Sequence, residues 1–186
     1  MRNSVHFTFT GGTTALAATP GDNLSRPDAA TLTPDIRCLG PEDESELFRV
    51  LLSLDRSSRR SRFGQCVSDT YLAHHAQTAL GNANWIAGAF IDERLRGVVE
   101  VYDCKSHGWA EAAFVVEQEW RRRGLGWTLL RAAMRKTADA SETNTLRMTF
   151  SRHNWPMRKL AAKANGRFDV ILDEISVDLA VNGQIG

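Results

Sequence analysis

The sequence of 186 residues lacks the marks of several classes of protein. Its three cysteines are odd in number and scattered, which argues against a secreted disulfide framework and fits reduced thiols in the cytoplasm. A net charge of +1 gives no overall attraction to nucleic acid or to an anionic membrane, so any anion must be recognised by a local site. No apolar run is long enough to span a membrane, and Arg2 is not followed by the apolar stretch of a signal peptide.

Metal ligands are also sparse. Cys104 and His107 form one isolated pair, and His74 and His75 form another, with no second set at metal-binding spacing. We therefore predict no metal site. Cys66 and Cys104 are interpreted as buried or inert thiols rather than nucleophiles.

What is present is an ordinary globular composition, with 42% hydrophobic and 24% charged residues, long enough for one domain with its own core. Residues 1–34 are rich in Gly, Pro, Thr, Ser and Ala and poor in periodic apolar residues, so they are predicted to form a flexible tail. Its one strand-like piece is the alternation of Val5, Phe7 and Phe9. The domain is predicted over 35–186.

Hydrophobic periodicity and capping residues predict the order of elements within this domain. Helices are expected from Pro41, from Ser68 or Asp69 to Gly81, from Leu125, and from Asn154, with a basic loop over 56–62. Strands are expected over 36–39, 85–91, 95–102, 109–117, 145–150, 168–172 and 175–181. The order predicts an α+β fold with a mixed, mostly antiparallel sheet of about seven strands and about four helices.

The sharpest local signal is the segment Arg121 to Gly126, which lies between the strand ending near Glu117 and the following helix. A helix N-terminus offers unpaired N–H groups and a partial positive charge, and glycines let a pyrophosphate approach the backbone. The third glycine of a dinucleotide fingerprint and the Gly-Lys-Ser/Thr of a nucleotide-triphosphate loop are both missing. Taken alone, the segment is either a phosphate site or a tight turn without a ligand.

This segment resembles the Q/R-x-x-G-x-G/A acyl-CoA motif of the GNAT N-acetyltransferase superfamily, with Arg121, Gly124 and Gly126 at its fixed positions. The resemblance extends over about residues 35–182. Residues 95–99 look like the family's third strand, 110–116 like its fourth, and Asn154-x-x-Met157-x-x-Leu160 like the start of its last core helix.

The resemblance implies an acyl-CoA-dependent N-acyltransferase that uses acetyl-CoA or another acyl-CoA and no metal. It implies that the backbone N–H groups from Arg122 to Gly126 hold the pyrophosphate. The full implied cofactor set is Val115, Val116, Glu117, Arg121, Arg122, Arg123, Gly124, Leu125, Gly126, Trp127 and Asn154. Val115 to Glu117 would offer backbone groups to the pantetheine arm. Alternative interpretations are a solvated helix start for the arginines, packing anchors for Trp120 and Trp127, and a simple N-cap for Asn154.

A neutral amine must attack the thioester, so a base or a water relay is needed. Glu111 matches the position where many family members place this base, and Glu100 and Asp103 are its competitors. Family members often carry a tyrosine, as general acid, where this sequence has Ala161. Tyr71 and Tyr102 are the only tyrosines, and neither is at that position, so no general acid is assigned.

The segment from Arg56 to Phe63 looks like the S-R-x-x-R-F segment of GNAT domains in bacterial protein lysine acetyltransferases. Its arginines either steer an acidic acceptor or form a solvated basic loop. The acceptor is predicted to be a small-molecule amine or a protein lysine, and a homodimer stays open. The alternative function is a non-catalytic acyl-CoA-binding sensor; nucleic-acid binding ranks last because stacking aromatics do not interleave the arginines.

Overall fold

The computed structural model describes residues 33–104, 107–140 and 143–181. The chain divides into two units, 1–31 and 32–186, and the description below concerns the second. The predicted tail, with its alternation of Val5, Phe7 and Phe9, lies almost wholly outside the described residues.

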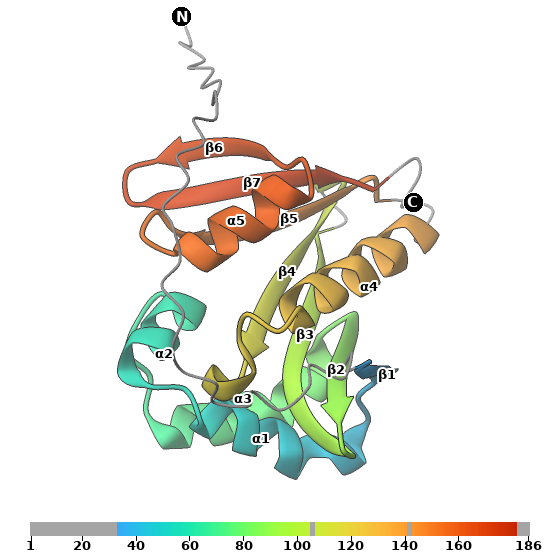
Figure 1. Ribbon diagram of the computed structural model, residues 1–186, viewed down its shortest axis with the longest axis vertical. Helices are drawn as coiled ribbons and strands as arrows, with labels where there is room; N and C mark the ends of the chain where they lie inside the picture. The colour runs from blue at the N-terminus through green and yellow to red at the C-terminus, as the bar shows by residue number, and fades with distance from the viewer. Residues whose placement is uncertain (1–32, 105–106, 141–142, 182–186) are drawn as a thin grey trace, which may run out of the picture. The chain divides into compact units, whose positions relative to one another are not determined.

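One seven-stranded sheet with the strand order β1-β2-β3-β4-β5-β7-β6 forms the centre of this unit (Figure 1). Its neighbouring strands are antiparallel except for β4 and β5, which are parallel. The predicted α+β class and the mixed, mostly antiparallel sheet are therefore confirmed. The strands are β1 (Asp35–Cys38), β2 (Trp85–Ile91), β3 (Arg94–Cys104), β4 (Trp109–Val116), β5 (Thr145–Ser151), β6 (Arg167–Ile171) and β7 (Glu174–Ala180).

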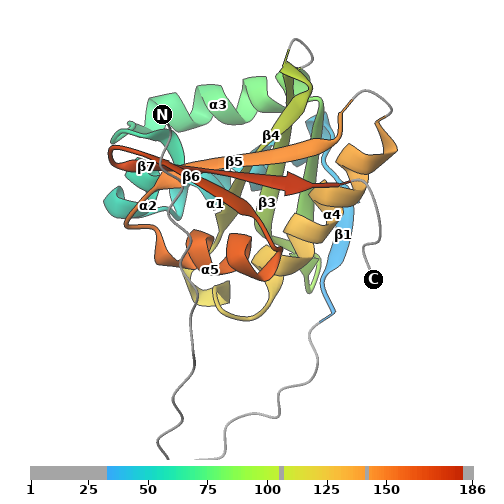
Figure 2. The same cartoon turned by 90° about the horizontal axis from the view of Figure 1, so that it is seen from above.

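Helices cover both faces of the sheet. They are α1 (Glu44–Leu52), α2 (Arg56–Phe63), α3 (Asp69–Asn82), α4 (Leu125–Asp139) and α5 (Trp155–Lys163), with 3-10 turns at Pro41–Asp43 and Gln118–Trp120. Figure 2 shows α3 on one side of the sheet and α4 and α5 on the other. Each face therefore has its own buried apolar cluster.

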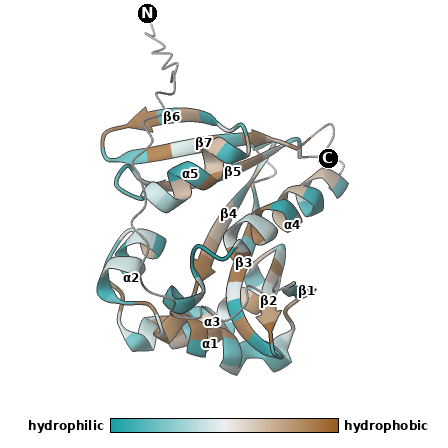
Figure 3. Cartoon of the chain, in the orientation of Figure 1, coloured by the Kyte–Doolittle hydropathy of each residue, from teal (hydrophilic) through white to brown (hydrophobic). Residues whose placement is uncertain are grey.

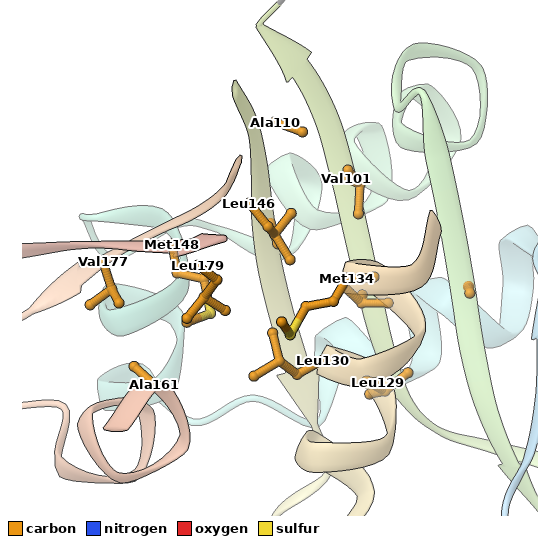
Figure 4. Close-up of a cluster of buried hydrophobic side chains, with 14 of the residues drawn as sticks. Val101, Ala110, Leu129, Leu130, Met134, Leu146, Met148, Ala161, Val177 and Leu179 are labelled. Atoms are coloured by element: carbon orange, nitrogen blue, oxygen red, sulfur yellow. The ribbon is translucent and has the colours of Figure 1, made fainter. Parts of the chain in front are cut away.

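The larger cluster joins α4 and α5 to the sheet. Leu129, Leu130 and Met134 of α4 lie beside Val101 and Leu146 of the strands (Figure 4). On β4, Ala110 and Ala112 belong to this cluster, whereas Val115 belongs to the cluster under α1 and α3. The odd-numbered residues of β4 thus face α1 and α3, because side chains alternate along a strand.

The sheet opens between its two parallel strands. β4 and β5 pair only at Ala110 with Leu146 and at Glu111 with Arg147, and beyond these residues the two strands diverge (Figure 1). The carboxyl-terminal half of β4 therefore has backbone groups on its β5 edge that no strand pairs with among the described residues.

The prediction of a basic loop over 56–62 was wrong, because these residues form α2. Asp55 caps this helix by accepting a hydrogen bond from Ser58 N at 2.7 Å, and its side chains are polar over most of its length (Figure 3). None of its residues is fully buried, so hydrophobic periodicity carried no signal for it.

Candidate active site

The turn that precedes α4 has the conformation of an anion site. Arg122 and Gly124 have positive φ values of 61° and 90°, and the first intrahelical bond of α4 is from Thr128 N to Gly124 O at 3.0 Å. Within the described part of the chain, the six successive amides from Arg122 to Trp127 have no acceptor. Unpaired N–H groups at a helix N-terminus and in a turn with left-handed residues are the usual donors to phosphate.

A cleft of about 610 Å³ opens beside these amides. It lies between the diverging strands and is bordered by α2, by the turn before α4 and by α5. Its lining residues include Leu54, Ser58, Ser61, Arg62, Ala112, Ala113, Phe114, Val115, Val116, Arg121, Arg122, Gly124, Gly126, Trp127, Asn154, Met157, Lys159, Leu160 and Lys163. The turn predicted to bind phosphate and the diverging ends of β4 and β5 therefore line the same cleft.

The two glycines of the motif are needed for different reasons. Gly124 has a φ that side chains rarely adopt, so the turn itself requires glycine. A Cβ at Gly126 would meet only the Leu160 Cδ2 atom, at 3.9 Å, so the fold has room for a side chain there. Glycine inside a helix costs about 1 kcal/mol relative to alanine. The fold of the free protein gives no reason for a glycine at position 126. A ligand that lies close to the backbone would give one, because it needs the space that a side chain would fill.

The three arginines of the motif have different surroundings. Arg121 donates from Nε to Val116 O at 3.1 Å and from Nη2 to Ser58 Oγ at 3.0 Å, so it reaches α2 across the cleft. Arg122 lines the cleft. Arg123 stacks on the Trp120 ring at 4.8 Å, and Arg96 stacks on the same ring at 4.9 Å.

The backbone of β4 shows which residues face the opening. Glu117 N donates to Arg96 O of β3 at 3.0 Å, and Glu117 O accepts from Trp120 N at 2.9 Å. Because backbone groups alternate between the two edges of a strand, Val115 also faces β3, whereas Phe114 and Val116 face β5. Of the three residues predicted to offer backbone groups to pantetheine, Val116 has the suitable direction.

Glu117 instead anchors the turn through its side chain. Its carboxylate is 9% exposed and pairs with Arg49 of α1 and with Arg96 of β3, the second at 3.1 Å. A buried carboxylate is stable only when charged partners compensate its desolvation. Glu117 therefore holds the end of β4 in place just before the turn that leads into α4.

Asn154 is both an N-cap and a link between helices. Its Oδ1 accepts from Met157 N at 3.3 Å, and its Nδ2 donates to Ser61 Oγ of α2 at 2.7 Å. Trp127 lies at the other end of α5, where the Lys163 ammonium sits 4.2 Å from the ring centroid. The bulk of Leu125 is in the core, with 2% exposure, so only its backbone is available at the turn.

The three carboxylates considered as the base occupy different places. Glu111 pairs with Tyr102 in the sheet, and both face the α1 and α3 side, as does Ala113, which lines the cleft. Asp103 pairs with Ala110 and faces the other side, where it accepts from Thr143 Oγ1 at 3.4 Å. Glu111 lies just outside the lining residues, one pleat from Ala113.

Glu100 is the most deeply buried of the three, with 1% exposure. Its carboxylate accepts from Arg62 Nη2 at 2.6 Å, from Tyr102 Oη at 2.8 Å, and contacts His75 Nε2 at 3.1 Å. Burial alone would raise the pKa of Glu100, but Arg62, His75 and Tyr102 lower it to about 2. A carboxylate with so low a pKa is a weak general base near neutral pH.

Sequence reasoning missed four polar residues: Ser58 and Ser61 of α2, which line the cleft, and His75 and Tyr102, which contact Glu100. They come from α2, α3 and β3, and no local spacing relates the residues of one element to those of another. The one signal was the Arg62-Phe63 pair in the basic segment, and it did not indicate that Arg62 reaches Glu100.

Among the described residues, no three His, Cys, Asp or Glu side chains come together as a metal site would require. In the same part of the chain, no helix has the length and apolarity to cross a membrane.

The fold, the cleft and the turn before α4 together have the features expected of an acyltransferase. The sequence profile of the acetyltransferase (GNAT) family matches residues 48–166, nearly two thirds of the chain. The chain therefore belongs to the GNAT acetyltransferase family and is an acetyltransferase enzyme. No significant match is found among curated protein sequences.

Solved structures with low sequence identity have the same fold. The GNAT domain of S. lividans PAT is 16% identical, with a TM-score of 0.67 over 79% of this chain and 90% of that one. RimL, a ribosomal L7/L12 alpha-N-protein acetyltransferase in complex with coenzyme A, is 12% identical, with a TM-score of 0.67 over 82% and 96%. The PaiA N-acetyltransferase from Thermoplasma acidophilum, also with coenzyme A, is 19% identical, with a TM-score of 0.61 over 80% and 99%.

Proposed function

We propose that this enzyme transfers an acetyl or other short acyl group from acyl-CoA to an amine by direct attack on the thioester. The observation that carries the proposal is the run of six amides, from Arg122 to Trp127, with no acceptor in the described chain. Four of these residues line the cleft, and one of the four is Gly126, which the fold itself does not need. A pyrophosphate is the ligand that such a turn fits.

The remaining parts of the co-substrate fit the cleft in order. Arg121, Arg122 and Lys163 are the cations at the phosphate end. The Val116 backbone faces the opening between β4 and β5, where a pantetheine arm would find hydrogen-bond partners. When bound, acyl-CoA supplies the activated thioester carbonyl, and the chain supplies positioning and proton transfer.

Glu111 is our candidate for the base, acting directly or through a water molecule on the protonated amine. It faces the α1 and α3 side with Ala113, and the low pKa of Glu100 makes that residue the poorer candidate. Ala161 is fully buried in the core, so α5 supplies no general acid at this position. We propose a small-molecule amine or a protein lysine as acceptor, and the cytoplasm, where reduced cysteines persist, as the compartment.

Calorimetric titration with acetyl-CoA tests the co-substrate. We expect micromolar binding by the wild type and a loss of at least about 100-fold for Gly126→Glu, because its carboxylate would face the phosphates. Gly126→Gln, of equal size and without charge, is the matched control and should lose much less. Both variants should unfold no more easily than the wild type, since helix propensity improves by up to about 1 kcal/mol. Failure of the wild type to bind acetyl-CoA or longer acyl-CoAs would reject the proposal.

A further inference from the structure

The four arginines of α2 fall into two sets. Arg59 and Arg62 bond to the body of the protein. Arg59 pairs with Asp69 at 2.6 Å and donates to two backbone carbonyls, and Arg62 pairs with the buried Glu100. These two side chains attach α2 to the fold.

Arg56 and Arg60 form the second set. Both are exposed, and neither has a carboxylate within ion-pair distance in the described chain. Residues four apart lie on one helix face, and like charges there repel each other. Arg56 is also the first residue of α2, where the helix dipole disfavours a cation. The electrostatic energy of these two arginines is therefore unfavourable in the free protein. A bound anion would make it favourable.

The neighbouring cleft is also positively charged. Its lining contains five cationic side chains, Arg62, Arg121, Arg122, Lys159 and Lys163, and no carboxylate from the described residues. The phosphates of acyl-CoA account for the cations at the α4 end, but Arg56 and Arg60 lie on the outer side of α2, beyond the cleft lining. A polyamine or a basic peptide would be repelled here.

We propose that the amine acceptor belongs to an acidic polypeptide segment whose carboxylates bind Arg56 and Arg60 of α2. The proposal rests on the acyl transfer proposed above and specifies its substrate class. A polypeptide is required because the two arginines are spaced about 5–6 Å apart on the outside of the helix, while the amine must enter the cleft. A small amine that fits beside pantetheine in about 610 Å³ would not reach them.

Cys66 provides a probe of this surface that does not depend on catalysis. Its thiol is exposed, and its Sγ lies 3.9 Å from Arg56 O. Arg56, and to a smaller extent Arg60, lower the pKa of Cys66. Carboxylates bound to the two arginines would cancel this effect and slow alkylation of the thiol, because the thiolate is the reactive form.

The test uses three peptides of equal length, each with one free amine, carrying glutamates, glutamines or arginines beside it. With acetyl-CoA, we expect kcat/KM for the glutamate peptide to exceed that for the glutamine peptide about tenfold, mainly through KM. The preference should fall as salt rises from about 0.05 M to 0.5 M. The Arg56→Glu/Arg60→Glu variant should reverse it. Arg135→Glu/Lys136→Glu, an equal charge change at exposed positions of α4, should leave it unchanged.

Alkylation of Cys66 by iodoacetamide, followed by mass spectrometry, separates this proposal from the acyl transfer itself. Protection by the glutamate peptide alone, lost in the Arg56→Glu/Arg60→Glu variant, supports the acidic-segment surface even if no acyl group is transferred. Equal alkylation rates with all three peptides, or equal kcat/KM values, would overturn it. Failure to bind acetyl-CoA would reject the acyltransferase proposal and leave the alkylation result to decide the surface.

Discussion

The two ends of the cleft differ in the groups that form them. The end where we propose that the phosphates bind is formed by backbone groups: amides without an acceptor in the described chain, and left-handed residues at Arg122 and Gly124. The other end is bordered by α2, and its Arg62 also belongs to a group of side chains from α2, α3 and β3 that meet around the buried Glu100. A backbone site depends on local conformation, which short motifs encode, whereas a side-chain site depends on the whole fold. Substitutions should therefore act differently at the two ends.

The largest effect is expected from Glu111→Gln at the acceptor end. If Glu111 is the base, kcat should fall by about 100- to 10,000-fold, while the affinity for acetyl-CoA stays the same. Steady-state kinetics together with calorimetry would separate the two quantities. An unchanged kcat would remove Glu111 from the mechanism. A parallel loss of acetyl-CoA affinity would make it a structural residue.

The next effect concerns the stability that Glu100 provides. Because its pKa is about 2 in the folded protein, below the ordinary glutamate value of about 4.3, its contribution is fully present above that value and is lost as pH falls toward 2. Glu100→Gln should lower the free energy of unfolding at pH 7 by about 3 kcal/mol, since the mostly covered Arg62 side chain, 13% exposed, loses its charged partner. The free energy of unfolding, measured with denaturant at several pH values between about 5 and 2, should depend less steeply on pH for this variant than for the wild type.

Glu93→Gln is the control for that measurement, because Glu93 is an exposed turn residue. It should change neither the stability nor its dependence on pH. If the free energy of unfolding depends equally steeply on pH for the wild type and for Glu100→Gln, then Glu100 is not held ionised in the fold.

The smallest effect tests the phosphate end. Gly124→Ala and Gly108→Ala both place a side chain at a positive φ, of 90° and 70°, with no atom within 4 Å of the new Cβ. Each should cost about 1–2 kcal/mol of stability. Only Gly124→Ala should also weaken acetyl-CoA binding, because only Gly124 is in the turn. Thermal unfolding and calorimetry on the same samples would check both, and a matching loss of affinity at Gly108 would contradict the assignment.

The turn before α4 could be predicted from the sequence far better than α2 and the contacts around Glu100. The order of the strands and the turn at Gly124 followed from periodicity, caps and a motif, all of which are local. α2 was missed because Arg59 and Arg62 bond to distant groups instead of burying an apolar face. The partners of Glu100 could not be inferred, since Arg62 and His75 lie 38 and 25 residues away along the chain. The direction of Val116 required the register of the sheet.

The empty space beside Gly126 has a consequence for protein engineering. A procedure that improves stability from this structure alone would replace Gly126, since a larger residue fits there and the helix would gain. The same replacement would fill the place where, in our proposal, the pyrophosphate approaches the backbone. Selection for a more robust fold and selection for activity therefore act in opposite directions on this residue, and a thermostable redesign should keep it fixed.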